Sequence, residues 1–491
     1  MQILSRAPFL PVLAGLVAAM GVSGRFSNVA LWWVVPSMAL ATAIVLIVLT
    51  GTEISRNHPQ IAVLTLLATL VCSIRIAFSL TRPPVLPSFL KTEGIVVESR
   101  PWGRLYSVSV ETRQGGFVLR LPFAELAEGQ LVHIEGVPRP FKNTPSKNGF
   151  REDLYWRARD MTAYLGSAGY KILPEEGRNC FALNSKAPFF NIHRWRYVLY
   201  RSLTLHLPRL TGAYLNAAWT GKRDKSLNER HRLTGTSHLL AVSGFHVGLL
   251  MKLASWVFRR GKIRTLCLSF LMWFYVFSTG ASASALRAGM MIQIALLGEI
   301  AGRPASTINS VSLAAVLLLL ESPFRFYDVG WRLSVLAAFA IATLLERGTL
   351  GRHPCLRFFA FSPLLWASTY PQTSWSFGSV PLAGLLINVF AADFFGVVLT
   401  AASLTVALHL LNLPGMGFPL QAVEGLFALW ETAAEGIVQL LPWQILWNPF
   451  LVHCCTVAFI AIFCRALLVP WRRIALLAPM GSVAAFLLFA I

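Results

Sequence analysis

One apolar stretch of the sequence contains polar and ionisable side chains whose types and spacing suit hydrogen bonding or proton transfer. His238, Ser243, Gly244 and His246 follow the motif Thr234-Gly-Thr-Ser237, which is typical of a helix start. On a helix beginning there, His238 and His246 would be roughly 80° apart around the axis and would share a broad face. Such a pair could hydrogen-bond, line a pore or shuttle protons. Polar residues at the membrane end of an apolar helix mark a functional site.

This stretch contains fewer residues that would support hydrolysis or metal binding. Ser243 and His246 resemble a nucleophile and its base, but no acid that would orient the histidine is evident. The histidines lack nearby partners for a metal, and the seven cysteines include no CxxC pair. The sequence therefore predicts no catalytic residue, no metal site and no cofactor. The Ser243-Gly244 pair also suits close helix packing or a kink.

Charged residues in otherwise apolar surroundings form a second group. Arg287 needs an anion if it is buried, which is either an anionic substrate or a carboxylate of the chain. The candidate carboxylates are Asp328, Asp393 and Glu299. Asp328 and Arg332 are spaced i,i+4 at an expected helix start, where they could cap and brace the helix. Arg325 and Arg332 are also candidates for facing an anionic substrate.

The composition of the chain indicates that these residues belong to a membrane protein. Of 491 residues, 55% are hydrophobic and only 13% are charged, and the mean hydropathy is +0.59. A soluble fold with so few charges could not cover its surface, which excludes an ordinary cytosolic enzyme, a coiled coil or a disordered chain. The net charge is +21, and residues 82–236 hold 24 Lys and Arg against 13 Asp and Glu. A basic segment of this kind favours a polyanionic partner, either phospholipid headgroups or nucleic acid.

Hydrophobic patterning divides the chain into four parts: N-terminal transmembrane helices in 1–80, a β-domain in 81–175, basic amphipathic linker helices in 176–236 and a transmembrane domain in 237–491. The first part contains apolar stretches at 8–24, 28–50 and 60–80, the first interpreted as a retained helix. Alternation in the second part predicts five short strands, with a hairpin turn at Gly115-Gly116. The expected strands are 91–99, 104–112, 115–121, 130–138 and 161–173. They indicate a small OB-like β-barrel, although an open β-sandwich would show the same pattern.

Apolar runs resume at residue 237 and continue to Ile491, which gives about ten to twelve spans in total. The stretch 379–411 is too long for one simple helix and contains Asn388, Asp393 and Gly396, so we expect it to be broken or re-entrant. The stretch 417–441 is expected to be amphipathic because its three glutamates fall on one helical face. They are Glu424, Glu431 and Glu435.

Loop charge predicts the orientation. The densest basic loop, 259–264, should be cytoplasmic. One span, 237–258, separates it from the β-domain, which therefore lies on the outer face, and counting back three spans places Met1 inside. Arg303 and the segment 347–357 fall on the cytoplasmic side by the same alternation.

Several motifs together resemble the ComEC competence family of inner-membrane DNA-uptake channels. The run His238-Leu-Leu-Ala-Val-Ser-Gly-Phe-His-Val-Gly248 is similar to that family's HLLAxSGxHVG signature, and it follows a basic amphipathic lead-in. Ser284-Ala-Leu-Arg-Ala-Gly289 is similar to the LRA element, 328–334 resembles the aspartate-led DPGFQLS motif, and 379–388 resembles a segment ending in asparagine. The N-terminal part also matches the organisation of the family. A few transmembrane spans come first, and an OB-like domain follows, which ends near residues 148–150 and 155–156. The resemblance runs from about residue 8 to at least 400.

The resemblance implies a channel that conducts single-stranded DNA across the cytoplasmic membrane. It places along the DNA path His238, Ser243, Gly244, His246, Arg287, Asp328, Arg332 and Asn388. In the OB-like domain, arginines could hold phosphates and aromatic rings could stack bases without reading sequence. These candidates are Arg100, Trp102, Arg104, Tyr106, Arg113, Phe117, Arg120, Tyr155 and Trp156, although aromatic residues of a small barrel more often form its core.

Departures from the family pattern define the expected partners. Val329 and Arg332 replace the usual Pro and Gln, and Arg151 stands where Asp usually follows the Gly-Phe pair. None of the ten histidines forms the HxHxDH array of the metallo-β-lactamase-like domain found in many members, and there is no P-loop. We therefore expect a short form that is not itself an enzyme. Its expected partners are single-stranded DNA, membrane lipid, a periplasmic DNA-binding receptor, a separate nuclease and a cytoplasmic DNA-translocating motor.

Two other functions stay open at this point. An intramembrane hydrolase or lipid-linked sugar transferase would use His238, Ser243 and His246 with an acid. A small-solute transporter would have its site at the expected break around 388–396.

Overall fold

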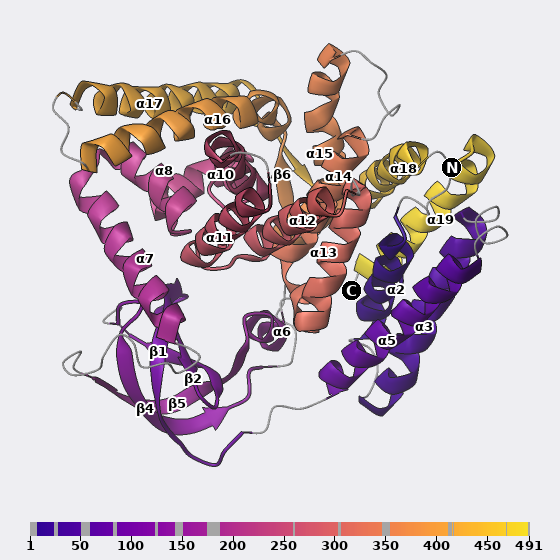
Figure 1. Ribbon diagram of the computed structural model, residues 1–491, viewed down its shortest axis with the longest axis horizontal. Coiled ribbons are helices and arrows are strands. Elements are labelled where there is room, and N and C mark those ends of the chain that lie inside the picture. The colour runs from indigo at the N-terminus through magenta and orange to yellow at the C-terminus, as the bar shows by residue number, and fades with distance from the viewer. Residues whose placement is uncertain are drawn as a thin grey trace.

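The computed structural model describes residues 7–489 except 24–27, 51–58, 82–85, 123–125, 143–150, 174–186, 259–260, 303–305, 346–353, 411–414, 416 and 468. Helices α2 (Phe9–Ser23), α3 (Asn28–Thr50) and α5 (Pro59–Thr81) pack together beside the C-terminal helices α18 (Pro449–Ala466) and α19 (Trp471–Phe489), as Figure 1 shows. Gly15 allows α2 and α3 to approach closely, since a Cβ there would lie 2.4 Å from the carbonyl oxygen of Ala39. The two ends of the chain therefore share one edge of the molecule.

Five strands follow, close to the residues that alternation predicts. They are β1 (Leu90–Trp102), β2 (Leu105–Thr112), β3 (Gly115–Leu121), β4 (Leu131–Arg139) and β5 (Met161–Ile172). Their hydrogen-bonded order is β1-β2-β3-β5-β4, and β4 pairs with β1, which closes the sheet. Only β3 and β5 run parallel. A short helix, α6 (Glu152–Arg157), lies in the connection between β4 and β5. We call residues 86–173 the β-domain.

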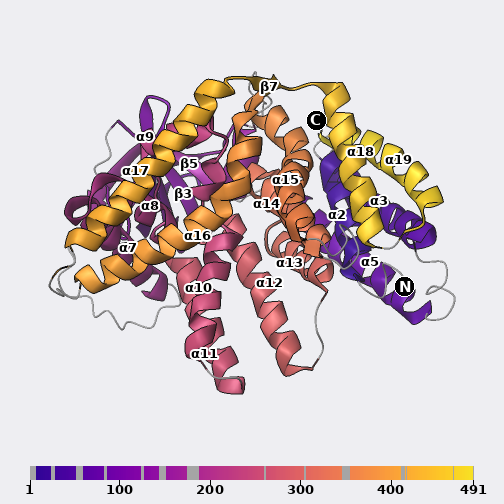
Figure 2. The ribbon, with the colours of Figure 1, turned by 90° about the horizontal axis from the view of Figure 1, so that it is seen from above.

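Three helices connect the β-domain to the rest of the chain: α7 (Ala187–His206), α8 (Arg209–Trp219) and α9 (Lys225–Leu233). The part that follows is almost entirely helical. It comprises the 3-10 turn η1 (Ser237–Leu239), α10 (Gly244–Val257), α11 (Lys262–Ser278), α12 (Ala283–Ile300), α13 (Thr307–Glu321), the 3-10 turn η2 (Pro323–Tyr327), α14 (Val329–Leu345), α15 (Pro354–Phe377), β6 (Ser379–Pro381), α16 (Ala383–Leu410), α17 (Gly417–Leu440) and β7 (Gln444–Leu446), before α18 and α19. In Figure 2, α17 lies beside α16, and both helices pack on α8.

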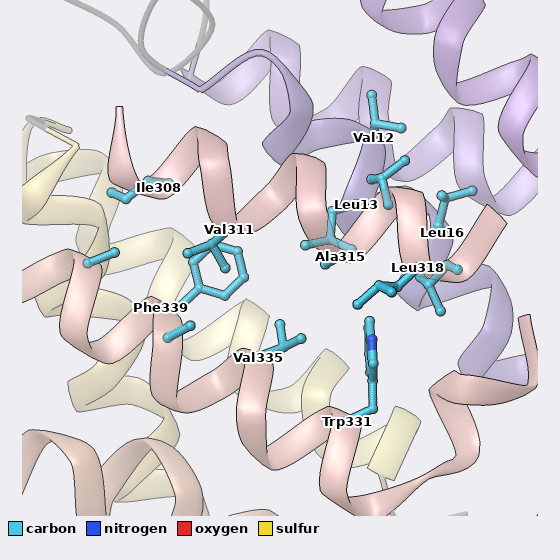
Figure 3. Close-up of a cluster of buried hydrophobic side chains, with 14 of the residues drawn as sticks. Val12, Leu13, Leu16, Ile308, Val311, Ala315, Leu318, Trp331, Val335 and Phe339 are labelled. Atoms are coloured by element: carbon cyan, nitrogen blue, oxygen red, sulfur yellow. The ribbon is translucent and has the colours of Figure 1, made fainter. Parts of the chain in front are cut away.

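The largest hydrophobic core joins segments that are far apart in the sequence. In Figure 3, Val12, Leu13 and Leu16 of α2 meet side chains of α13 and α14. The partners include Val311, Ala315, Leu318, Trp331, Val335 and Phe339. Burial of these side chains fixes α2 against the helices that carry the later motifs.

Four helices in the described part of the chain are long and apolar enough to cross a membrane: Gln60–Thr81, Ala283–Ile300, Ala383–His409 and Pro449–Ala466. Apolar side chains are exposed along one stripe of α11, at Ile263, Leu266, Phe270 and Phe274. This i, i+3, i+7 spacing places them on one helical face. Exposure of such an apolar face to water is unfavourable. The fold is therefore mainly helical, with several helices apolar enough to cross a membrane and a small β-domain.

The helices have one end near the β-domain, the proximal end, and one away from it, the distal end. Gly280, between α11 and α12, touches Arg196 of α7, and η2 lies against α6. Ser23 at the end of α2 hydrogen-bonds Tyr327 of η2 at 2.5 Å, whereas the backbone N–H of Phe9 donates to Asn309 at the start of α13 at 3.2 Å. The start of α2 and the C-terminal ends of α10, α12 and α14 are therefore distal. Arg259, Arg260, Arg303 and residues 347–353 of the basic loops lie outside the described residues.

Two expectations about helices are wrong. Residues 383–410 form one continuous helix, α16, and not a broken segment. Its polar residues do not interrupt it because they find tertiary contacts: the Asn388 side chain donates to the carbonyl of Gly235 at 3.4 Å, and Gly396 lies against the ring of Phe245. The second concerns the stretch 237–258, where the α-helix begins only at Gly244. The expected helix at 417–441 is present as α17.

Candidate functional site

The signature residues form an irregular loop and not the first turns of a helix. After α9, Gly235 adopts a φ of +73°, Ser237–Leu239 form η1, and Ser243 is the extended N-cap residue of α10. The prediction that His238 and His246 share a helical face is therefore wrong. His238 lies on η1 and is exposed, whereas His246 lies one turn into α10 and is buried. We call residues 234–243 the signature loop.

Ser243 and His246 form a capping box at the start of α10. The Ser243 hydroxyl lies 3.1 Å from His246 Nδ1, and the backbone N–H of Ser243 donates to the same nitrogen at 3.3 Å. Such a box satisfies backbone donors that the first turn of a helix leaves free. No carboxylate contacts His246 among the described residues. The pair therefore has a structural role that the sequence did not indicate, since the usual box carries Glu or Gln at the third position.

Substitutions at Ser243 test its capping role. We expect Ser243→Asn to keep the stability of the wild-type protein, because asparagine caps helices as well as serine does. Ser243→Ala should destabilise the protein by about 1 kcal/mol. Melting temperatures of the purified variants provide the measurement. Equal destabilisation by Ser243→Asn and Ser243→Ala would contradict the capping role.

The signature loop packs on the start of α16. A Cβ on Gly235 would lie 3.1 Å from Cα of Gly384, so the two backbones are in direct contact. Asn388, one turn further along α16, donates to the carbonyl of Gly235, and its own carbonyl oxygen has no partner among the described residues. The structure thus brings together two of the motifs identified in the sequence.

Arg287 lies beneath the start of α10. A Cβ on Gly244 would be 3.5 Å from Nη2 of Arg287, so the guanidinium reaches the first residue of that helix. Arg287 is 7% exposed, its Nε has no hydrogen bond, and no ion pair to it exists among the described residues. The candidate acids are engaged or remote: Glu299 binds Arg264 at 2.8 Å, Asp328 lies 3.9 Å from Arg159, and Asp393 is exposed on α16. The expectation that one of them neutralises Arg287 is not met.

Asp328 joins the β-domain to the helices. Its carboxylate accepts from the backbone N–H of Gly330 at 3.1 Å at the start of α14, and it faces Arg159 of the β-domain. Next to it, the guanidinium of Arg157 lies 3.9 Å from the ring centre of Phe324. Arg332 does not pair with Asp328; its guanidinium lies 5.9 Å from the ring centre of Phe326. Asp328 thus caps its helix, whereas the predicted bracing pair with Arg332 is absent.

A buried junction that the sequence did not predict fixes the β-domain on the other side. Glu128, in the connection between β3 and β4, is 3% exposed and accepts from Arg196 of α7 at 2.7 Å and from Lys222 at 3.2 Å. Arg196 also donates to the carbonyl of Val97 at 3.3 Å. Burial lowers the pKa of Lys222, although Glu128 opposes this effect. We call Glu128, Arg196 and Lys222 the Glu128 junction. No motif or periodicity of the sequence indicated this junction.

A second buried network holds the signature loop to α17. His231 of α9 is 1% exposed, and its Nδ1 lies 2.7 Å from the Thr236 hydroxyl. Its Nε2 lies 2.7 Å from the Tyr214 hydroxyl and 3.1 Å from the Glu431 carboxylate. Glu424, one of the other glutamates on the predicted face of α17, accepts from the backbone N–H groups of Leu210 and Thr211 at the start of α8. The glutamates on this face of α17 therefore contact α8 and α9 of the same chain, which the sequence did not indicate.

The expected DNA-binding residues of the β-domain do not form one surface. Phe117 and Trp156 are each 1% exposed and belong to hydrophobic clusters, so they cannot stack bases. Arg104 and Arg113 lie in the turns at opposite ends of β2, roughly 25 Å apart. Arg120 is engaged with Glu152.

One cationic and aromatic group near Trp102 is partly buried, and its Arg100 also lies 3.7 Å from the Glu98 carboxylate. Arg100 lies 5.3 Å from the ring centre of Tyr155 and 6.0 Å from that of Trp102, and Tyr155 and Trp102 are only partly buried. Tyr106 is partly buried in β2, where it pairs with Pro101 of β1. Arg104 and Arg113 of the predicted surface are more exposed than this group but lie apart from it.

His193, on α7 next to the Glu128 junction, makes stability dependent on pH. Burial and, secondarily, the charge of Arg196 lower its pKa to about 4, and its Nδ1 has no hydrogen bond among the described residues. Between pH 6.5 and 4 the unfolded chain binds a proton that the folded chain does not, so stability should fall by up to about 3 kcal/mol as the pH decreases. Melting temperatures between pH 7.5 and 4.5 should decrease less in His193→Phe than in the wild type. His206→Gln, which changes an exposed histidine, is the control. Equal slopes in His193→Phe and the wild type would contradict this assignment.

Comparison with known proteins addresses the same region. A family model described as Competence protein matches residues 219–473, just over half of the chain, and this range contains the signature loop, Arg287, Asp328 and Asn388. ComE operon protein 3 of Bacillus subtilis (strain 168) is 34% identical over 166 residues, which are 32% of this chain and 21% of that relative. The alignment thus spans about a fifth of the length of the relative. No solved structure matches the chain.

Proposed function

Because the chain belongs to the ComEC-type competence protein family, we propose that it conducts single-stranded DNA across the cytoplasmic membrane during natural transformation. The observation that carries the proposal is the meeting of the family motifs at the proximal end of the helices. There the signature loop contacts the start of α16, and the unpaired Arg287 lies beneath α10. A strand with one negative charge per nucleotide needs such uncompensated cations in an otherwise apolar bundle.

The orientation that loop charge predicts is supported by the arrangement of the ends. The C-terminal ends of α10, α12 and α14, which precede the basic segments in the chain, are distal, and so is the start of α2. We propose that the distal end is cytoplasmic and that the β-domain lies on the outer, periplasmic side. The four long apolar helices and five shorter ones are consistent with ten to twelve spans if α10, α15 or α17 also cross.

We infer that the β-domain is of the OB type. A closed sheet of five strands in the order β1-β2-β3-β5-β4 supports this assignment, because OB folds are five-stranded Greek-key barrels that bind oligonucleotides. The patch around Arg100, Trp102 and Tyr155 would gather the incoming strand. A periplasmic DNA receptor, a separate nuclease and a cytoplasmic motor would deliver, process and pull the strand.

The hydrolase is the second candidate, favoured by the 3.1 Å contact between Ser243 and His246. It would require an acid that orients His246, and none does so among the described residues. The transporter has lost its basis, since the break on which it depended is replaced by the continuous helix α16.

Deletion of the gene tests the proposed function. We expect labelled DNA to remain bound at the cell surface but to enter the cytoplasm at least tenfold less, with transformation lost in parallel. Complementation with the wild-type gene is the control for polar effects. Normal cytoplasmic entry in the deletion strain would refute the channel function.

A further inference from the structure

We infer that Arg287 and the N-terminus of α10 form a binding site for one phosphodiester anion, which the proposed function identifies as a linkage of the passing strand. The first observation is the state of Arg287. Its guanidinium is buried, yet it has neither an ion pair nor a hydrogen bond among the described residues. A buried cation without a partner costs several kcal/mol, so a protein retains one where an anion arrives from outside.

The second observation is the helix end that Arg287 faces. α10 begins at Gly244 and runs for 14 residues. The capping box engages the backbone N–H groups of Ser243 and His246, whereas those of Gly244 and Phe245 have no partner among the described residues and point toward the signature loop. Its first turn contains no acidic residue, so nothing on the helix compensates the positive end of its dipole. Nη2 of Arg287 lies 3.5 Å from the position that a Cβ on Gly244 would take. The guanidinium and the positive end of the α10 dipole are therefore adjacent. Backbone N–H groups at a helix start together with a guanidinium are a recurring phosphate-binding arrangement.

The lack of a side chain at Gly244 keeps this point open. A Cβ there would contact Ala288 at 3.4 Å and Arg287 at 3.5 Å and so would occupy the space in front of the guanidinium. Ser243 and Gly244 are only partly buried, and His238 on the same loop is exposed, so a ligand can reach the site from the signature loop. The site is small and holds one anionic linkage without contact to a base, which suits transport that does not depend on sequence.

Binding by purified full-length protein in maltoside detergent, which contains no phosphate, tests the site directly. The probe is a fluorescent twenty-nucleotide oligothymidine, and its control has neutral methylphosphonate linkages. We expect the wild type to bind the charged probe at least tenfold more tightly than Arg287→Gln does, and both proteins to bind the neutral probe equally. Arg264→Gln, which removes a distal arginine paired with Glu299, should bind as the wild type does. Equal affinity of wild type and Arg287→Gln for the charged probe would overturn the proposal.

Stability provides a readout that a merely structural arginine would not give. Because Arg287 is unpaired, Arg287→Gln should raise the melting temperature by a few degrees while it weakens binding. A lower melting temperature in both Arg287→Gln and Arg287→Met would show an internal partner and refute the site.

A thermal shift produced by added phosphatidylglycerol or inorganic phosphate, but not by the oligonucleotide, and lost in Arg287→Gln, would support the anion site and refute the strand as its ligand. Conversely, loss of DNA uptake in the deletion strain but normal uptake in a folded Arg287→Gln strain would refute the site alone. The two proposals can therefore fail separately.

Discussion

Replacing Glu128 by glutamine should destabilise the protein by about 3–5 kcal/mol, because it leaves Arg196 and Lys222 buried without their counter-charge. Glutamine preserves the shape of the side chain, so the loss isolates the charge. The melting temperature of the purified protein should fall, and proteolysis should release the β-domain earlier than in the wild type. DNA uptake should fall with it, since Lys222 belongs to the segment that leads into the signature loop.

Glu135→Gln is the matched control for this experiment. Glu135 also lies in the β-domain and faces a lysine, but its pair with Lys91 is 3.9 Å long and both side chains are largely exposed. Exposed pairs contribute between zero and about 1 kcal/mol. Similar destabilisation by Glu128→Gln and Glu135→Gln would mean that the Glu128 junction does not stabilise the fold.

The second large effect is expected at Gly221. Its φ is +73°, and a Cβ there would lie 2.5 Å from the backbone oxygen of Thr279. Gly221→Ala therefore combines a strained conformation with a clash that no side-chain rotation relieves, and we expect it to destabilise the protein by roughly 2–4 kcal/mol. In this variant the clash would push the segment after α8 away from the connection between α11 and α12. We therefore expect DNA uptake to decrease as well. Thermal unfolding and the uptake assay measure the two effects.

Two glycines provide controls that separate the causes. Gly378 has a φ of +82° but nothing within 4 Å of a Cβ, so Gly378→Ala should cost only about 1–2 kcal/mol. Gly248 lies within α10 without a positive φ or a close neighbour, and Gly248→Ala should be neutral or slightly stabilising. If Gly221→Ala and Gly378→Ala were equally destabilising, the contact with Thr279 would have no energetic importance.

Features set by local patterns could be predicted from the sequence. The five strands begin and end near their expected residues because inward side chains such as Val132 and Ile134 alternate with outward ones. The hairpin turn lies at Arg113-Gln114, two residues before the predicted Gly115-Gly116, which are the first paired residues of β3. The amphipathic helix at 417–441 could also be predicted, since its three glutamates share one face. Both patterns are determined within a few residues of each other.

Features set by distant contacts could not. The sequence Thr234-Gly-Thr-Ser237 has the residues of a helix start, but there the chain stays irregular because His231 holds Thr236 and Gly235 packs on Gly384. Glu128 meets Arg196 from 68 positions away, and His231 meets Glu431 from 200. Such pairs leave no periodicity, so neither the junction nor the real surroundings of the signature residues could be found in advance.

The β-domain touches the helices at two separate places, the Glu128 junction and the contact of Arg159 and Arg157 with Asp328 and Phe324. A rigid body attached at two points can only rock about the line that joins them. Tension on a thread held in the β-domain would therefore act as a torque about that axis. Lys222, at one end of this axis, precedes the signature loop in the chain, so the torque would act on the segment that leads into that loop.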